Sequence, residues 1–171
     1  MVTETLLILF LLSLILFLCY FYASFFIGAP FVITPMHIVN EMMQLGNVKK
    51  KDIVVDLGSG DGRILIVAAQ KGAYARGWEI NPFLVAWTNL MALIKGVKPL
   101  VAVYCKSYHQ ADLRSATVVM FYNIPTHVPA LEKKLKQELK PGTKILSYQF
   151  PLSKFTLKKE TKSGIYLYTA S

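Results

Sequence analysis

The sequence predicts an α/β fold in which a doubly wound sheet follows one N-terminal apolar helix. Through most of the chain, short apolar runs alternate with stretches of helical spacing, which is the pattern of strand–helix–strand units. A glycine-rich loop, GSGDG at residues 58–62, lies between the first such run and the helical stretch after it. A long uncharged segment precedes all of this, so the 171 residues fit one domain with one additional element.

The N-terminal segment predicts a retained transmembrane anchor over residues 1–27. Residues 6–27 are 22 consecutive residues without a charge. As a helix they would rise about 33 Å, and a bilayer core is about 30 Å thick. A cleaved signal peptide is the alternative, but it has a basic start and a shorter apolar core, whereas this chain begins MVTET. All Lys and Arg follow this segment, which favours a single-pass membrane protein with its domain on the cytoplasmic side, or the matrix side in a mitochondrion.

The chain is basic, with a net charge of +9, and its lysines crowd the C-terminal third. This pattern fits a nucleic-acid footprint, attraction to a lipid surface, or a solvated lysine-rich face. Because arginines are few and aromatic residues do not interleave with basic runs, we expect no nucleic acid partner. Cys19 and Cys105 imply no disulfide framework, and the scattered histidines lack ligand spacing, so no metal site is expected. The oligomeric state is left open.

Each element of the predicted domain over residues 28–171 follows from a local pattern. Amphipathic spacing indicates helices, and short apolar runs bounded by turn residues indicate strands. The helix at 82–95 has a proline in its first turn and a glycine after its end, as helices favour. In chain order the predictions are helix 35–45, strand 53–57, helix 63–71, strand 74–80, helix 82–95, strand 100–104, strand 117–122, helix 128–139, strand 143–150 and a hairpin of 155–160 with 164–169.

The glycine-rich loop has the position of a cofactor site. In a doubly wound sheet, ligands bind beyond the carboxyl ends of the strands. Gly58, Gly60 and Gly62 permit positive φ and close approach of a ligand, and the N–H groups that open the next helix favour an anion. The spacing is one residue shorter than the dinucleotide fingerprint, and Asp56 just before the loop suits an ammonium better than a pyrophosphate. S-adenosylmethionine carries an ammonium and a carboxylate at one end, so it is the predicted cofactor.

A second acid supports this prediction. Glu79 ends the second predicted strand, 17 residues after Gly62. A carboxylate there can accept hydrogen bonds from both ribose hydroxyls of a nucleoside. Two alternatives stay open, namely a nucleotide-dependent oxidoreductase and a tight turn with an unrelated surface acid. The combination of loop and acid favours a nucleoside cofactor.

Several segments together resemble one family. DLGSGDGRILIVAA at 56–69 and GWEINPFLV at 77–85 look like motifs I and II of class I, seven-β-strand methyltransferases. GAPFVITP at 28–35 and FYNIP…LEKKLKQEL at 121–139 narrow the resemblance to the small membrane-anchored protein-lysine methyltransferases of mitochondria and their prokaryotic relatives. The mitochondrial members act on lysines of the adenine nucleotide translocase and the ATP synthase c-subunit. The resemblance implies a Rossmann-like doubly wound sheet, S-adenosylmethionine as cofactor and a protein substrate embedded in a membrane.

The resemblance also assigns cofactor-binding residues by position, with one departure. Family members carry an acid after the third strand, near the adenine, where this chain has Ser107. A serine hydroxyl can still hydrogen-bond an amino group, but more weakly than a carboxylate. The other assignments are Asp56, Gly58, Ser59, Gly60 and Gly62 at the methionine end, Glu79 at the ribose, Asn81 beside the adenosine and Thr34 at the cofactor carboxylate.

The methyl acceptor is expected to enter past the fourth strand, where Tyr122 or Asn123 would orient its amine. An equally good interpretation is that both residues only pack or cap the next helix. A lysine amine has a pKa of about 10.4 and must lose a proton before it attacks, yet the sequence offers no clear base. The N-x-P order at 123–125 also resembles the N-P-P-Y loop of adenine and glutamine N-methyltransferases. A methyltransferase of nucleic acid or a small molecule, and a catalytically silent cofactor-binding membrane protein, therefore stay open as alternatives.

Overall fold

The computed structural model describes residues 2–26, 32–122 and 128–171, and within α1 (Val2–Phe26) it describes the side chains of residues 3–18. The chain divides into two units, Met1–Val32 and Ile33–Ser171. The first unit contains α1, and the second contains every other helix and strand that the structure describes.

The first unit corrects one prediction from the sequence. Within the described residues, no helix has both the length and the apolarity that a membrane span requires. The transmembrane anchor predicted over residues 1–27 is therefore not supported. The predicted single-pass localisation, with the domain on the cytoplasmic or matrix side, is wrong.

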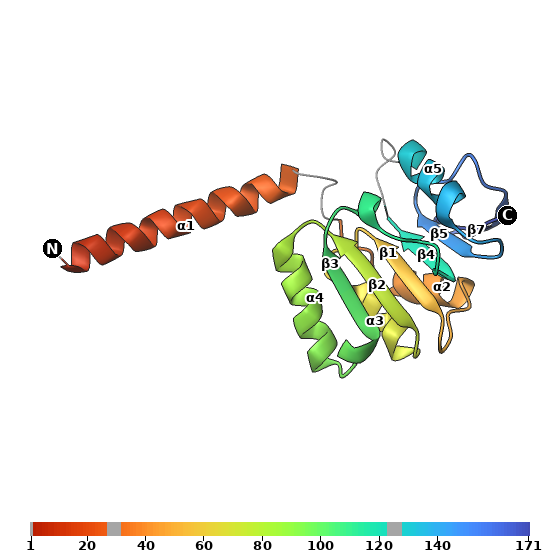
Figure 1. The fold of residues 1–171 in the computed structure, drawn as a ribbon, viewed down its shortest axis with the longest axis horizontal. Helices are drawn as coiled ribbons and strands as arrows, with labels where there is room; N and C mark the ends of the chain where they lie inside the picture. The colour runs from red at the N-terminus through yellow and green to blue at the C-terminus, as the bar shows by residue number, and fades with distance from the viewer. Residues whose placement is uncertain (1, 27–31, 123–127) are drawn as a thin grey trace. The chain divides into compact units, whose positions relative to one another are not determined.

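The second unit is built on a seven-stranded sheet in the order β3-β2-β1-β4-β5-β7-β6 (Figure 1). Neighbours among β1 to β5 pair in parallel, and β7 runs antiparallel to both β5 and β6. The chain proceeds outward from β1 to β3 and then returns to place β4 on the other side of β1, so the order reverses between β1 and β4. The strands are β1 (Ile53–Leu57), β2 (Tyr74–Glu79), β3 (Val101–Cys105), β4 (Val118–Phe121), β5 (Lys144–Tyr148), β6 (Leu157–Glu160) and β7 (Ile165–Thr169).

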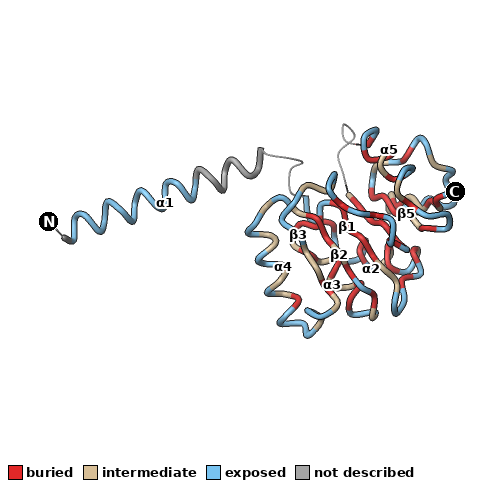
Figure 2. The backbone as a smooth tube through the Cα atoms, viewed as in Figure 1, coloured by how far each residue is buried: buried red, intermediate tan, exposed pale blue. Residues whose placement is uncertain are grey.

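Two apolar cores flank the sheet, and its central strands lie buried between them (Figure 2). Buried side chains of three helices, among them Met42, Ile64 and Ala92, pack in one core. Leu131 and Leu135 of another helix pack in the second core, on the opposite face. The helices are α2 (Met36–Leu45), α3 (Arg63–Gln70), α4 (Pro82–Ile94) and, in the second core, α5 (Val128–Glu138).

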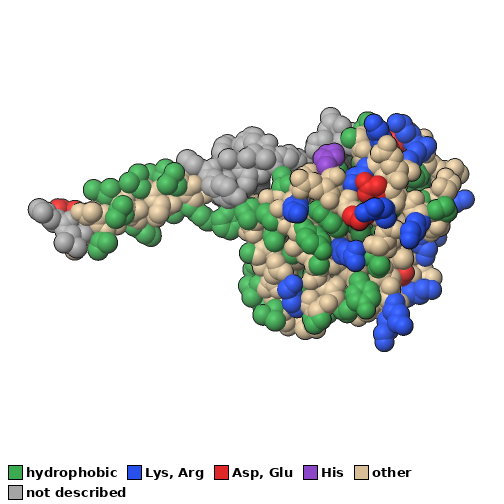
Figure 3. All heavy atoms as spheres, viewed as in Figure 1, with side chains coloured by type: hydrophobic (Ala, Val, Ile, Leu, Met, Phe, Trp, Pro, Cys, Tyr) green, Lys and Arg blue, Asp and Glu red, His purple; other side chains and the backbone are tan. Residues whose placement is uncertain are grey.

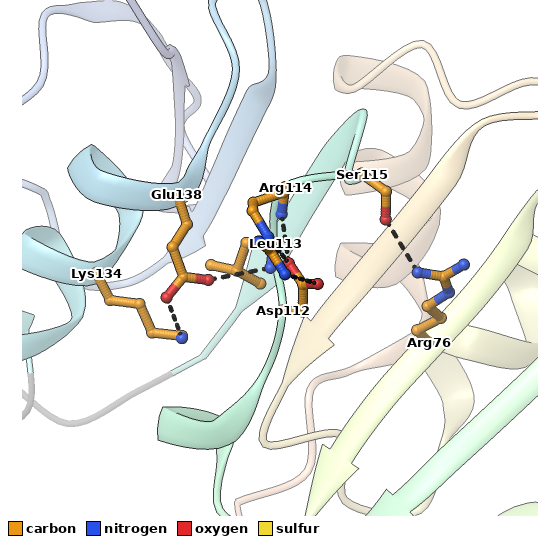
Figure 4. A network of polar contacts seen from close by, with 7 residues as sticks. All are labelled: Arg76, Asp112, Leu113, Arg114, Ser115, Lys134 and Glu138. Carbon is orange, nitrogen blue, oxygen red and sulfur yellow. Dashed lines mark hydrogen bonds and ion pairs between the residues drawn. The ribbon is translucent and has the colours of Figure 1, made fainter.

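A polar network joins α5 to the segment that leads into β4 (Figure 4). The Glu138 carboxylate accepts a hydrogen bond from the backbone N–H of Leu113 at 3.1 Å and pairs with Lys134 one turn earlier in the helix. Nearby, Arg76 of β2 donates to the Ser115 hydroxyl at 3.0 Å. These contacts hold the segment that enters β4 against both α5 and β2.

The sequence predicted the elements of this unit well. Every helix and strand expected from the apolar patterns is present, and no boundary differs by more than two residues. The expected C-terminal hairpin is formed by β6 and β7. Two short 3₁₀ turns, Lys98–Leu100 and Tyr108–Gln110, were not predicted, because three-residue turns lack a repeating apolar pattern.

Candidate functional site

The glycine-rich loop connects the carboxyl end of β1 to the first turn of α3. Gly58, Gly60 and Gly62 all have positive φ, at 92°, 53° and 78°. A Cβ on Gly62 would lie 2.3 Å from the Thr88 side chain of α4, so this glycine permits the close packing of the loop on that helix. At Gly58, in contrast, no described residue other than its chain neighbours has a heavy atom within 4 Å of the Cβ position. The loop thus presents bare backbone to open space at its first glycine.

Glu79 joins the glycine-rich loop to the start of α4. Its Oε2 accepts a hydrogen bond from the Gly60 N–H at 2.9 Å, and its Oε1 accepts one from the Asn81 N–H at 2.8 Å. The loop is also held by the Trp78 carbonyl, which accepts from the N–H groups of Gly58 and Ser59 at 3.0 Å. Each carboxylate oxygen of Glu79 can accept a further hydrogen bond, because each has two lone pairs.

Asp56 is a buried acid directly beneath the loop. It is 2% exposed, and its pKa is raised to about 8 by burial, then by the negative charges of Glu79 and Asp61. The carboxyl is therefore mostly protonated at neutral pH, and a cation placed beside it would favour its charged form. The buried Ser59 hydroxyl has no hydrogen-bond partner among the described residues. A buried acid and an unpartnered hydroxyl fit the ammonium and carboxylate of an amino acid.

Arg63 holds the segment before α2 against the loop. Its guanidinium pairs with Asp61, and its Nη1 donates to the backbone carbonyl of Thr34 at 2.8 Å. The hydrogen bond with Asp61 raises the pKa of Arg63, so the guanidinium stays charged. Thr34 is buried and reaches the loop through this arginine. The structure thus brings Thr34 to the same edge of the sheet as Asp56, Gly58, Ser59, Gly60, Gly62 and Glu79.

Ser107 and Asn81 both serve as caps of local structure. The Ser107 hydroxyl accepts a hydrogen bond from the His109 N–H at 3.4 Å and so caps a 3₁₀ turn. The Asn81 side chain accepts from the Phe83 N–H at 2.9 Å and caps α4. Ser107 follows β3 closely, and the neighbouring Lys106 N–H donates to the Glu79 backbone carbonyl at 3.1 Å. Both residues therefore lie beside the carboxyl end of β2.

Tyr122 lies at the carboxyl end of β4, across the switch point from the glycine-rich loop. Its hydroxyl donates to Oε1 of Gln149 at 2.8 Å, and its ring centroid lies 4.8 Å from that of Tyr148 and 6.0 Å from that of Phe150. Burial and the neighbouring Tyr148 raise the pKa of Tyr122 above its usual value. The other residue predicted to orient the acceptor, Asn123, lies outside the described residues.

Sequence reasoning did not identify three residues of this edge. Arg63 follows the glycines directly, and its position in the GDGR motif was the available signal. Thr88 meets Gly62 through the packing of two helices, which no local pattern reveals. Gln149 follows β5, the strand that pairs with β4, so the strand order brings Gln149 and Tyr122 together.

Comparisons with known proteins agree with this geometry. The family model of the ANTKMT methyltransferase domain matches residues 56–159. A protein-lysine N-methyltransferase of Saccharolobus islandicus is 34% identical over 135 residues, which cover 78% of this chain and 84% of that protein. The mouse lysine N-methyltransferase of the ATP synthase c-subunit is 37% identical over 112 residues, which cover 66% of this chain.

One similar protein has been solved with a nucleoside ligand bound. The crystal structure of an RNA methyltransferase from Salinibacter ruber, in complex with S-adenosyl-L-homocysteine, has a TM-score of 0.76 and 35% identity, and the match covers 81% of this chain and 92% of that one. The mouse and rat relatives are longer, and the match spans 45% and 52% of their lengths, or about half. The matched segment includes the glycine-rich loop, Glu79, Tyr122 and α5, and on this basis the chain belongs to the family of the ANTKMT methyltransferase domain.

Proposed function

We propose that this chain is an S-adenosylmethionine-dependent protein-lysine N-methyltransferase, with residues 28–171 as its catalytic domain. The observation that carries the proposal is the edge of the sheet at which Glu79 binds the Gly60 backbone beside the buried Asp56. This arrangement can recognise a ribose and an ammonium at once. The family and the S-adenosylhomocysteine in the Salinibacter structure support the same cofactor.

Different residues of this edge would bind different parts of the cofactor. The remaining lone pairs of Glu79 would accept hydrogen bonds from the two ribose hydroxyls, and Asp56 would hold the ammonium. The Ser59 hydroxyl and the backbone of the glycine-rich loop would bind the carboxylate, with Thr34 held close by Arg63. Ser107 and Asn81 would lie beside the adenosine. S-adenosylmethionine, when bound, would supply an electrophilic methyl group for transfer to the acceptor nitrogen, with its sulfur as the leaving group.

Tyr122 orients the acceptor amine and does not act as its base. Its raised pKa keeps the phenol protonated at neutral pH, so it exchanges hydrogen bonds and removes no proton. The lysine ammonium, with a pKa of about 10.4, loses its proton to water before it enters the site. The neutral nitrogen then has a lone pair with which to form the new bond, and the chain contributes mainly the alignment of the reacting groups.

The acceptor is proposed to be a lysine of a membrane protein. The printed names of the relatives support a protein lysine, and those of the mouse relatives specify the ATP synthase c-subunit and the adenine nucleotide translocase. Lys and Arg side chains gather over the part of the surface that carries α5 (Figure 3). This surface suits a partner with negative charge, such as an acidic segment of the acceptor or the lipid surface around it.

Methylation of RNA is the second candidate function. The Salinibacter structure is titled an RNA methyltransferase, and it matches this chain over most of its length. The same basic surface could bind phosphates. The few arginines of the sequence and the printed names of the curated relatives favour the protein substrate.

One experiment distinguishes these functions. Purified chain and methyl-labelled S-adenosylmethionine are incubated with membranes, cytosolic protein and total RNA from cells that lack the protein, and the Glu79→Ala variant serves as control. Label in protein, recovered after hydrolysis as methylated lysine, supports the proposal, and its presence in the membrane fraction supports a membrane acceptor. Label in RNA alone would replace the proposal by the second candidate. Cofactor binding without label in any fraction would indicate a silent binder.

A further inference from the structure

Gln149 has an unusual backbone conformation at the acceptor side of the site. It directly follows β5 and has a φ of 65°, in the left-handed region that residues other than glycine seldom adopt. Two hydrogen bonds hold it there. Its N–H donates to the Gly164 carbonyl at 2.8 Å, and its Oε1 accepts from the Tyr122 hydroxyl at 2.8 Å. Strained residues of this kind persist only where their surroundings fix them, and they cluster at functional sites.

The loop that follows Gln149 is anchored by buried polar side chains of other elements. The Tyr168 hydroxyl of β7 accepts from the Leu152 N–H at 2.8 Å. The carboxylate of Glu132 in α5, which is 1% exposed, accepts from the Lys154 N–H at 2.7 Å and from the Ser153 hydroxyl. Because α5 and β7 both bind this loop, Gln149 is attached to a rigid segment.

The strand register places the end of β4 beside the start of the glycine-rich loop. Asp56 of β1 pairs with Met120 of β4, and each strand ends one residue later, so the loop and Tyr122 follow the carboxyl ends of two neighbouring parallel strands. Parallel neighbours lie about 4.8 Å apart. Apart from its chain neighbours, no described residue lies within 4 Å of a Cβ built on Gly58, so a ligand has space at this edge of the sheet.

We propose that Gln149 is a positioning residue that fixes the direction of the Tyr122 hydroxyl toward the methyl acceptor. A tyrosine hydroxyl has one proton to donate and two lone pairs, and a glutamine carbonyl oxygen can only accept. With its proton donated to Gln149, the Tyr122 oxygen offers lone pairs alone, which accept an N–H of the neutral lysine amine. The nitrogen lone pair then stays free to form the bond to the methyl carbon, and the methylammonium that results loses its extra proton to water. This inference rests on the proposed function.

The test compares variants that distinguish the hydrogen bond between Tyr122 and Gln149 from the positive φ of Gln149. Gln149→Gly tolerates the positive φ but removes the acceptor oxygen, whereas Gln149→Glu keeps one. Tyr122→Phe removes the hydroxyl, and Tyr74→Phe at the opposite end of the sheet is the matched control, because Tyr74 is the first residue of β2. For each variant, kcat and KM are measured with the membranes described above as acceptor, together with calorimetric S-adenosylmethionine binding and thermal unfolding.

We expect Gln149→Gly and Tyr122→Phe each to lower kcat about tenfold, with unchanged cofactor affinity and Tm. The double variant should lose no more than Tyr122→Phe alone, because both act through one hydroxyl. Gln149→Glu should retain most of the rate, and Tyr74→Phe all of it. A wild-type kcat in Gln149→Gly, or losses that multiply in the double variant, would overturn the inference and leave the proposed function intact. Absence of methylated lysine with the wild-type chain would overturn both.

Discussion

Asp56 is the residue whose charge should respond most strongly to the cofactor. Its pKa is raised to about 8 by burial and by Glu79 and Asp61, so the free protein holds a proton there at pH 7. An ammonium beside the carboxyl favours the charged form, and binding should therefore release a proton. Calorimetry at pH 7 in buffers of different ionisation enthalpy measures this release. Asp56→Asn should bind more weakly without releasing it, and equal proton release in both proteins would contradict the assignment.

The raised pKa of Asp56 also predicts how the stability of the protein depends on pH. A carboxyl whose pKa is higher in the folded chain than in the unfolded chain binds more protons when folded, so its contribution to stability is complete below pH 4 and is lost as the pH rises through about 8. The free energy of unfolding of the cofactor-free protein should thus fall between pH 5 and pH 8 more steeply than that of Asp56→Asn. Urea unfolding across this range measures the difference, and parallel curves for the two proteins would contradict it.

Glu79 should determine the affinity for the nucleoside part of the cofactor. Glu79→Ala removes two charge-assisted hydrogen bonds to the ribose, each worth about 1.5–3 kcal/mol, and releases the Gly60 and Asn81 N–H groups. Calorimetry should show S-adenosylmethionine affinity reduced by at least about 100-fold. Unchanged affinity would remove Glu79 from the site, and tight binding of a nicotinamide dinucleotide by the wild-type chain would favour the oxidoreductase alternative.

Among the elements, the glycine-rich loop contains two glycines whose substitution should have different effects. One substitution should mainly reduce stability, and the other should mainly reduce cofactor binding. Gly62→Ala places a Cβ 2.3 Å from the Thr88 side chain, so it should destabilise the fold by about 2–4 kcal/mol through overpacking and a strained φ. Gly58→Ala meets open space and should cost about 1 kcal/mol of stability, while it obstructs the cofactor. Denaturant unfolding and cofactor calorimetry test both variants. Similar stability of the two, or wild-type binding by Gly58→Ala, would contradict these roles.

A second element-scale prediction concerns the attachment of α5 to the loop after β5. Glu132 is buried and accepts hydrogen bonds from Lys154 and Ser153. Glu132→Ala leaves those donors without their partner and should destabilise the fold by about 2–4 kcal/mol. Glu138→Ala is the matched control on the same helix. It removes the pairing with Lys134 and the hydrogen bond from the Leu113 N–H, but it should cost less because the Glu138 side chain is more exposed to water. Urea unfolding compares the two, and an equal loss would mean that Glu132 is no special anchor.

For the whole molecule, we expect the salt concentration to affect methylation of the acceptor more than binding of the cofactor. The chain has a net charge of +9, and its basic side chains gather over the surface that carries α5 (Figure 3). Raising the salt concentration from about 0.05 M to about 0.5 M shortens the screening length severalfold and should slow methylation of an acceptor bound through these charges. S-adenosylmethionine affinity, which depends on buried contacts, should change little. Equal salt dependence of both would argue against a role for the basic surface.

Local sequence patterns were enough to predict the α/β fold class and the order of the elements. Apolar periodicity and turn residues act locally, so they located every strand and α-helix described in the unit Ile33–Ser171 to within two residues. The glycine-rich loop and Glu79 could be assigned because strand ends and spacing are local properties. The resemblance to a methyltransferase family, now confirmed by the family model, depended on the same short segments.

The uncharged N-terminal run led to a wrong prediction. Uncharged residues at 6–27 predicted a transmembrane helix and a membrane localisation, and the structure does not support a span within its described residues. Hydrophobicity is a necessary property of a span, but an apolar run is not by itself sufficient evidence for one.

The contacts between residues that are distant in the sequence became known from the folded structure alone. The strand order places Tyr122 beside Gln149, and the packing of α3 on α4 brings Gly62 against Thr88. The raised pKa of Asp56 also depends on burial beneath the folded sheet edge and on the charges of Glu79 and Asp61. These are long-range contacts, and their energies depend on exclusion of water and on side chains from several elements. A local sequence pattern does not show which side chains meet or how far water is excluded from them. For this reason the sequence predicted the cofactor loop but not the contacts that position the acceptor.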